Sequence, residues 1–152
     1  MSWDLLADDA PELAARARRL FAETHGRAFL ATISADGSPR VHPIAPLVTP
    51  SAVHLAVRWD SPKLRDLHAV PRFALHSSVH PPDDEELAVR GTAVVASDDG
   101  IRRAVAEERV SGAELDDSMA LLALTPEWVS WRVWHDGHPR RVLWRVGDPG
   151  RG

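Results

Sequence analysis

The sequence contains no cysteine among its 152 residues, so it has neither a disulfide framework nor a thiolate zinc site. It also lacks a long apolar run, because no stretch approaches the roughly 20 residues that a membrane-spanning helix requires. Residues 1–9 have none of the regions of a signal peptide, since Asp8 and Asp9 stand where apolar residues are needed. We therefore expect a cytoplasmic protein that makes no contact with membranes.

Positive charge is also in short supply. The net charge is -4 at pH 7 and the isoelectric point is near 6.0. Proteins that bind nucleic acid carry a basic surface that displaces counterions from phosphate, so we expect no nucleic-acid partner. The content of 44% hydrophobic and 26% charged residues is typical of a soluble globular protein, and the length suits one domain.

Apolar residues recur at two periods along the chain. A helical spacing that follows Asp9 and Pro11 and ends at Gly26 predicts one N-terminal helix within residues 1–26. Alternation of apolar and polar residues predicts short strands. The strands cover residues 28–33, 39–48, 53–57, 72–76, 87–95, 119–124 and 128–134, with local helices over 61–67 and 98–109 and tight turns at Asp36-Gly37 and Asp136-Gly137. Six to eight short strands favour an antiparallel barrel over a βαβ sheet.

The predicted strand over residues 39–48 contains three prolines, Pro39, Pro43 and Pro46. Each proline lacks the N–H group that a central strand donates to its neighbours. We therefore expect this strand to be interrupted or to lie at a sheet edge, where its backbone groups are free to meet a ligand.

The segment Arg58-Trp59-Asp60-Ser61-Pro62-Lys63 joins a strand to a helix. Ser61 has the position of a helix N-cap and Pro62 that of the first helical residue. The free N–H groups and positive dipole end of a helix favour an anion, to which Arg58 and Lys63 can add charge-assisted hydrogen bonds. These residues predict a phosphate site, although basic residues beside a loop are more often plain solvated surface.

Several short motifs occur in an order that resembles the FMN-binding split barrels related to pyridoxamine 5′-phosphate oxidase. The motifs are Phe29-Leu30-Ala31-Thr32, Asp36-Gly37-Ser38-Pro39-Arg40-Val41-His42-Pro43, Ser61-Pro62-Lys63, Pro71-Arg72-Phe73-Ala74-Leu75 and Val89-Arg90-Gly91-Thr92-Ala93. The resemblance implies a mainly β protein, a six- to eight-stranded antiparallel split β-barrel over residues 27–146 with the N-terminal helix packed on it. Residues 147–152 would form a disordered tail.

The same resemblance implies a cofactor site at a homodimer interface. Arg58, Ser61 and Lys63 would hold the FMN phosphate. The flavin ring would lie along the backbone of four residues of the proline-bearing strand: Val41, His42, Pro43 and Ile44. A tryptophan near the C-terminus of the partner subunit, Trp131 or Trp134, could stack on the ring, although burial in the barrel or in the dimer interface fits these two residues at least as well.

One departure from the family bears on the substrate. The C-terminal Arg-x-His-x-Arg order of pyridoxamine 5′-phosphate oxidases proper is missing from residues 135–141, so we expect that pyridoxamine 5′-phosphate is a poor substrate or none. Arg140 and Arg141 are adjacent, and on a strand they would point to opposite faces. Any small-molecule substrate should then be neutral or weakly charged.

The cofactor and the activity stay open at this point. Relatives in the superfamily use FMN, the deazaflavin F420 or haem, and the motifs do not separate FMN from F420. The protein is either an oxidoreductase that transfers hydride between the flavin and a small organic substrate, or a non-catalytic dimer that binds flavin or haem as a sensor or carrier. No catalytic residue is predicted. His76 and His80 stand four apart, but they lie at a strand end and in a proline-rich loop rather than on a helix face, so we expect no metal site.

Overall fold

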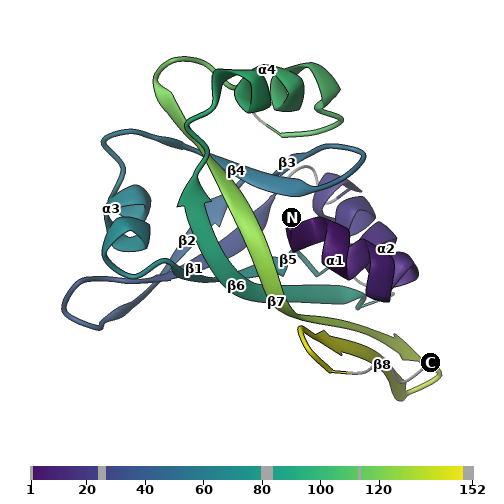
Figure 1. The fold of residues 1–152 in the computed structure, drawn as a ribbon. Coiled ribbons are helices and arrows are strands. Elements are labelled where there is room, and N and C mark those ends of the chain that lie inside the picture. The colour runs from purple at the N-terminus through teal and green to yellow at the C-terminus, as the bar shows by residue number, and fades with distance from the viewer. Residues whose placement is uncertain (1, 24–26, 80–83, 113, 149–152) are drawn as a thin grey trace.

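The computed structural model describes residues 2–23, 27–79, 84–112 and 114–148, and Figure 1 shows the arrangement of their helices and strands. The helices are α1 (Ser2–Asp9), α2 (Pro11–Glu23), α3 (Pro62–Ala69) and α4 (Asp99–Glu108). The strands are β1 (Ala28–Ile33), β2 (Pro39–Ile44), β3 (Leu47–Val48), β4 (Val53–Arg58), β5 (Arg72–Ser77), β6 (Glu86–Val95), β7 (Met119–His135) and β8 (His138–Arg145). Within the described ranges no helix is both long enough and apolar enough to span a membrane.

These strands form one antiparallel sheet that curls around a hydrophobic core (Figure 1). The strand order is β2-β1-β5-β6-β7-β4-β3, and β8 pairs with β7 outside this path. Alternate residues of each strand point inward, so that Leu30, Leu75, Val89 and Leu122 meet in the core. The predicted mainly β, antiparallel architecture is confirmed.

The prolines of residues 39–48 have the predicted effect. The chain forms two strands there, β2 and β3, which stand at the two ends of the strand order. β2, which contains Pro39 and Pro43, is an edge strand, as the missing proline N–H groups require. β3 begins after Pro46 and contains no proline, and Val48 forms an isolated bridge with Ser111.

The predicted N-terminal helix is present as α2, which starts at Pro11 and buries Leu13, Ala17 and Phe21, but a second helix that was not predicted, α1, precedes it. Trp3 and Leu6, one helical turn apart, are buried to 4% and 0% exposure, and this burial stabilises α1. Asp9 ends α1 instead of starting a helix, and its carboxylate accepts a hydrogen bond of 3.2 Å from the Trp144 indole. Gly26, the predicted helix end, lies outside the described residues.

The predicted break at Thr125-Pro126 is also wrong, because β7 runs without interruption from 119 to 135. Arg90 and Gly91 are neighbours on β6, yet their partners on β7 are two residues apart. Glu127 is thus the extra residue of a β-bulge, which admits a proline within a strand. The bulge lets one strand pair with β4, β6 and β8 in succession.

Two helices complete the barrel. α3 lies against β1, β4 and β6 with Leu64 and Leu67 buried in the core. α4 contributes Val105 to a smaller cluster with Leu47 and Leu121. The packing of α3 on the sheet fixes the start of this helix relative to the edge strand β2, and the candidate site lies between these two elements.

The close contact at the bulge predicts that a methyl group at position 91 strongly destabilises the protein. A Cβ at Gly91 would lie 1.8 Å from the Thr125 carbonyl oxygen, so the backbones of β6 and β7 would have to separate. We expect Gly91→Ala to lower the free energy of unfolding by about 3 kcal/mol, the upper end for overpacking. Urea unfolding followed by circular dichroism measures this value.

Gly37→Ala is the matched control. Gly37 has φ of +87° but nothing within 4 Å of an added Cβ, so only the backbone strain of about 1–2 kcal/mol applies. Equal losses in the two variants would contradict the close approach at Gly91.

Candidate functional site

The edge strand β2 presents two chemically different faces. Its outward residues Pro39, Val41 and Pro43 are exposed, and Val41 is 68% exposed. Its inward residues Arg40, His42 and Ile44 are half-buried. One side of the β2 backbone pairs with β1 and the other has no partner strand among the described residues. Part of the backbone and three inward side chains are therefore placed to meet a ligand.

The first turn of α3 lies close to the inward face of β2. Ser61 is the N-cap, and its hydroxyl oxygen accepts a hydrogen bond of 3.2 Å from the Leu64 amide. Pro62 has no N–H group, so the Lys63 amide is the donor of this turn that remains for an anion. Lys63 is half-buried and close enough to influence the ionisation of His42.

Arg58 is less firmly committed to this site. It ends β4, its side chain is 65% exposed, and its Nε lies 3.1 Å from an Asp60 carboxylate oxygen. The Arg58 guanidinium already donates two hydrogen bonds to the Asp60 carboxylate, so part of its hydrogen-bonding capacity is occupied. Among the cations of the segment, Lys63 is therefore the better placed to hold a phosphate.

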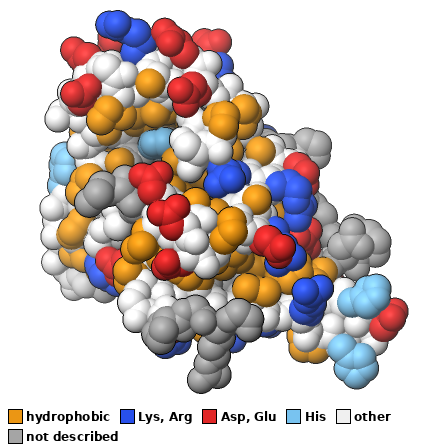
Figure 2. All heavy atoms as spheres, turned by 45° about the vertical axis from the view of Figure 1, so that its right-hand side comes forward, with side chains coloured by type: hydrophobic (Ala, Val, Ile, Leu, Met, Phe, Trp, Pro, Cys, Tyr) orange, Lys and Arg blue, Asp and Glu red, His pale blue; other side chains and the backbone are white. Residues whose placement is uncertain are grey.

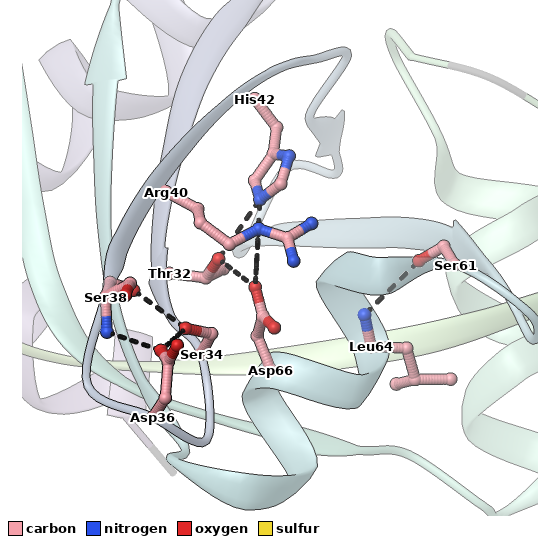
Figure 3. A network of polar contacts seen from close by, with 9 residues as sticks. All are labelled: Thr32, Ser34, Asp36, Ser38, Arg40, His42, Ser61, Leu64 and Asp66. Atoms are coloured by element: carbon pink, nitrogen blue, oxygen red, sulfur yellow. Dashed lines mark hydrogen bonds and ion pairs between the residues drawn. The ribbon is translucent and has the colours of Figure 1, made fainter.

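A buried carboxylate joins α3 to β1 and β2, as Figure 3 shows. The side chain of Asp66 is 6% exposed and receives a hydrogen bond of 2.7 Å from the Thr32 hydroxyl. The Nε of Arg40 lies 3.3 Å from the same Asp66 oxygen. The Thr32 hydroxyl is also 3.1 Å from Nε2 of His42. Three strand residues thus converge on one helical carboxylate, which offsets the cost of burying its charge.

The electrostatic surroundings of His42 disfavour its cationic form. Burial lowers the pKa of the His42 imidazole, and the positive charges of Lys63 and Arg40 lower it further, against an opposing effect of Asp66. His42 is consequently neutral at pH 7. The net positive charge beside it is left to Lys63 and Arg40.

The two candidate tryptophans lie elsewhere in the subunit. Trp131 is buried to 5% exposure, donates its indole N–H to Glu85 over 2.7 Å, and is covered by Arg16 of α2 at 4.0 Å. Trp134 is 44% exposed on the β7–β8 hairpin. This hairpin and α3 lie on opposite sides of the molecule (Figure 1). Stacking of either tryptophan on a flavin thus stays a prediction that requires a second subunit.

The C-terminal arginines point apart, as the alternation of β8 predicts. Arg141 donates a hydrogen bond of 3.1 Å to the Ser130 hydroxyl, whereas Arg140 lies 5.9 Å from the Trp131 ring. Because Ser130 and Trp131 are successive residues of one strand, they face opposite sides of the sheet. The two arginines do not form a joint phosphate site within one subunit.

A cavity of about 350 Å³ lies away from this region. It is lined by residues of α1, α4, β4 and β7, including Trp3, His54 and Val105. Figure 2 shows the hydrophobic side chains gathered below α4, at the top of the molecule. Burial lowers the pKa of His54, and no lysine or arginine is among the described residues that line the cavity. These residues therefore lack the cation that a phosphate would require.

No metal centre is evident in the part of the chain that the structure describes. It contains no group of three or more histidine, aspartate or glutamate side chains placed to share an ion. His80 lies outside the described residues, whereas Nδ1 of His76 is 2.7 Å from the carbonyl oxygen of Ser77.

Comparison with known proteins identifies the family. A family model for pyridoxamine 5′-phosphate oxidase matches residues 14–132. The chain belongs to this family. No curated protein matches the sequence significantly, so the oxidase family is reached through the family model and through the fold.

Several solved structures have the same fold as this chain, although their sequence identity to it is low. An FMN-binding protein related to pyridoxamine 5′-phosphate oxidase, from Nostoc punctiforme PCC 73102, is 17% identical with a TM-score of 0.69, covering 94% of this chain and 91% of its own. PhzG from Burkholderia lata 383, in complex with tetrahydrophenazine-1-carboxylic acid, is 15% identical with a TM-score of 0.68, covering 91% and 86%.

A third similar structure is HutZ, the haem storage protein from Vibrio cholerae. It is 16% identical with a TM-score of 0.55, covering 78% of this chain and 90% of its own. Together these structures confirm the split-barrel fold. At such identities they show the fold alone, and their ligands differ.

The sequence did not reveal the carboxylate network. Thr32 gave one signal, because it is a polar residue at an inward position of a strand whose other inward residues, Ala28 and Leu30, are apolar and buried. A buried hydroxyl requires a hydrogen-bond partner. Its partner Asp66 is 34 residues away on a helix, and strand periodicity carries no information on that contact.

The turn between β1 and β2 predicts a pH dependence. The Asp36 carboxylate accepts hydrogen bonds from the Ser34 hydroxyl at 2.5 Å and the Ser38 amide at 2.9 Å (Figure 3). These bonds lower the pKa of Asp36 to about 2. Its contribution to stability is therefore complete above the ordinary pKa of 3.8 and is lost as the pH falls towards 2.

Carboxyl ¹³C NMR during an acid titration measures this pKa directly. Ser34→Ala removes the largest cause of the shift, so the pKa of Asp36 should rise in that variant. An ordinary pKa for Asp36 in the unaltered protein would contradict the hydrogen-bonded turn.

Proposed function

We propose that this protein is a homodimeric oxidoreductase that binds FMN between the edge strand β2 and the start of α3 and serves hydride transfer to or from a small organic substrate. The observation that carries the proposal is the juxtaposition of Lys63 with His42 and Arg40 across the Asp66 network. This places cations and an N-capped helix start beside an edge strand in a chain of the oxidase family.

The residues at the start of α3 fit a phosphate group. Ser61 uses a lone pair to accept from Leu64, so its hydroxyl proton is still available to an anion. The Lys63 amide and ammonium supply two more donors, and hydrogen bonds to a charged group are stronger than neutral ones. Arg58 can join if it releases one of its contacts with Asp60.

Bound flavin would supply the hydride chemistry, and the protein would contribute binding, orientation and electrostatics. The β2 backbone at Val41, His42, Pro43 and Ile44 would support the ring. Lys63 and Arg40 would make the surroundings of the ring electropositive, which favours a reduced, anionic flavin. We assign no catalytic acid or base.

A non-catalytic dimer that carries flavin or haem is the second candidate. It is favoured by the fold shared with the haem storage protein HutZ. The visible absorption spectrum of the purified protein separates the cofactors, because FMN, F420 and haem absorb differently. Turnover with FMN or F420 and a reductant supports the oxidoreductase, whereas tight binding without turnover supports the carrier.

The phosphate site predicts a selective loss of affinity. Lys63→Ala should weaken FMN binding by about 1.5–3 kcal/mol, the range for a hydrogen bond to a charged group. Riboflavin has no phosphate and should lose much less. Quenching of flavin fluorescence during titration gives both dissociation constants.

Arg65→Ala is the control for this variant. Arg65 is an exposed cation on the same helix, but it donates to the backbone oxygen of Asp60 at 3.1 Å. It should affect FMN and riboflavin equally and slightly. If Lys63→Ala lost the same affinity for FMN and for riboflavin, the assignment of Lys63 to the phosphate would be wrong.

The proposed dimer uses the outer face of the sheet. Phe29 on β1 is 50% exposed and faces Pro43, while the neighbouring pair is Ala31 and Val41. Cross-strand partners lie on the same face, so these side chains form a continuous apolar patch. Exposed apolar patches are typical of interaction surfaces when they are large, which supports our placing the dimer contact here, and a second copy of the chain would also complete the cofactor site.

A charge in this patch should separate the subunits. We expect Val41→Glu to weaken the dimer at least about tenfold, equivalent to about 1.4 kcal/mol, because the carboxylate would lose its water in the interface. Leu5→Glu, at a 42% exposed position of α1, should leave the dimer intact. Analytical ultracentrifugation measures both. A monomeric unaltered protein with FMN still bound would refute the shared site.

A further inference from the structure

The hydrogen bonds of Thr32 determine where the proton of His42 lies. The Thr32 hydroxyl has one proton and donates it to Asp66 over 2.7 Å, since an ionised carboxylate can only accept. The hydroxyl oxygen therefore presents a lone pair to Nε2 of His42 at 3.1 Å. That contact is a hydrogen bond only if Nε2 carries a proton.

Neutral His42 is consequently the tautomer with hydrogen on Nε2 and a lone pair on Nδ1. No described residue forms a hydrogen bond with Nδ1. Burial and the nearby charges of Arg40 on β2 and Lys63 on α3 keep the ring neutral by lowering its pKa, and Asp66 on α3 is the one opposing charge. The side chain is still 15% exposed, so its ring remains accessible from the site.

Asp66 determines which groups donate and which accept in this set of hydrogen bonds. Without a carboxylate, Thr32 could donate its proton to Nε2, and the proton of the imidazole would then lie on Nδ1. The same Asp66 oxygen is also held by Arg40 at 3.3 Å, so the acceptor for Thr32 is fixed in place. The direction of the chain of hydrogen bonds runs from His42 through Thr32 to Asp66.

We propose that Asp66 and Thr32 are positioning residues that hold His42 with an unprotonated Nδ1, and that this Nδ1 accepts a hydrogen bond from an N–H or O–H donor of bound FMN. The inference deepens the proposed function and rests on it for the identity of the ligand. It assigns the His42 side chain a role in selecting a ligand with a donor at that point, whereas the family resemblance concerns the backbone of this strand.

The tautomer can be measured without any ligand. ¹⁵N NMR of the full-length protein labelled at histidine distinguishes a pyridine-type from a pyrrole-type nitrogen, and the signals of His42 are identified by their loss in His42→Asn. We expect pyridine-type Nδ1 and pyrrole-type Nε2 in the unaltered protein. Thr32→Ser should keep this pattern, while Thr32→Val should lose it. The opposite assignment in the unaltered protein overturns the inference, whether or not any variant folds.

Adding FMN tests the contact itself. The Nδ1 signal should move to lower ¹⁵N frequency, as expected for an accepted hydrogen bond, when flavin fluorescence shows that the site is filled. His42→Phe should bind FMN about five- to tenfold more weakly, the effect of one ordinary hydrogen bond. His42→Asn should restore part of the affinity, because its side-chain oxygen stands at the same distance from the backbone as Nδ1.

The two proposals fail in different ways. Saturating FMN that leaves the Nδ1 signal unchanged overturns the contact with FMN while the proposed function stands. Absence of FMN binding overturns the proposed function and, with it, the ligand assigned to Nδ1.

Discussion

The close approach of two backbones at Gly91 is the constraint on which the barrel depends. A side chain at this position would overlap the Thr125 carbonyl, so β6 and β7 can meet there only through glycine. The β-bulge at Glu127 lies at this contact, and a bulge bends the strand that contains it, here β7. Because β7 pairs with β4, β6 and β8, the closure of the sheet and the placement of its C-terminal hairpin both follow from this point.

Within that frame, the Asp66 carboxylate connects the elements of the candidate site. It lies on α3, and its partners Thr32 and Arg40 lie on β1 and β2. Removing this carboxylate would take away the ion-pair partner of Arg40 and would free the buried Thr32 hydroxyl to turn towards His42. The helix start that would hold phosphate and the strand that would support the ring are thus held together by a polar contact, in addition to the apolar packing of Leu64 and Leu67.

Local signals in the sequence predicted local structure well. Ser61 caps α3 as its position indicates, and the turn at Asp136-Gly137 has positive φ at both residues, as a tight hairpin requires. The failures involve distant contacts. Proline at 126 is ordinarily a strand breaker, and only the pairing with Gly91 shows why it is tolerated. The bond between Thr32 and Asp66 joins residues 34 apart, which no local periodicity encodes.

The two faces of β2 connect assembly with ligand binding. Val41 and Pro43 point out of the sheet, while Arg40 and His42 point towards α3, and all four belong to one six-residue strand. If a second subunit covers the outer face, it also fixes the backbone that carries the inner residues. A ligand held by the inner residues then binds a strand that is already ordered. Because linkage is reciprocal, that ligand must strengthen the dimer by the same factor by which the dimer strengthens its binding. If the dissociation constant of the dimer does not change when FMN is added, then subunit association on the outer face and ligand binding on the inner face are not coupled, even though both faces belong to one strand.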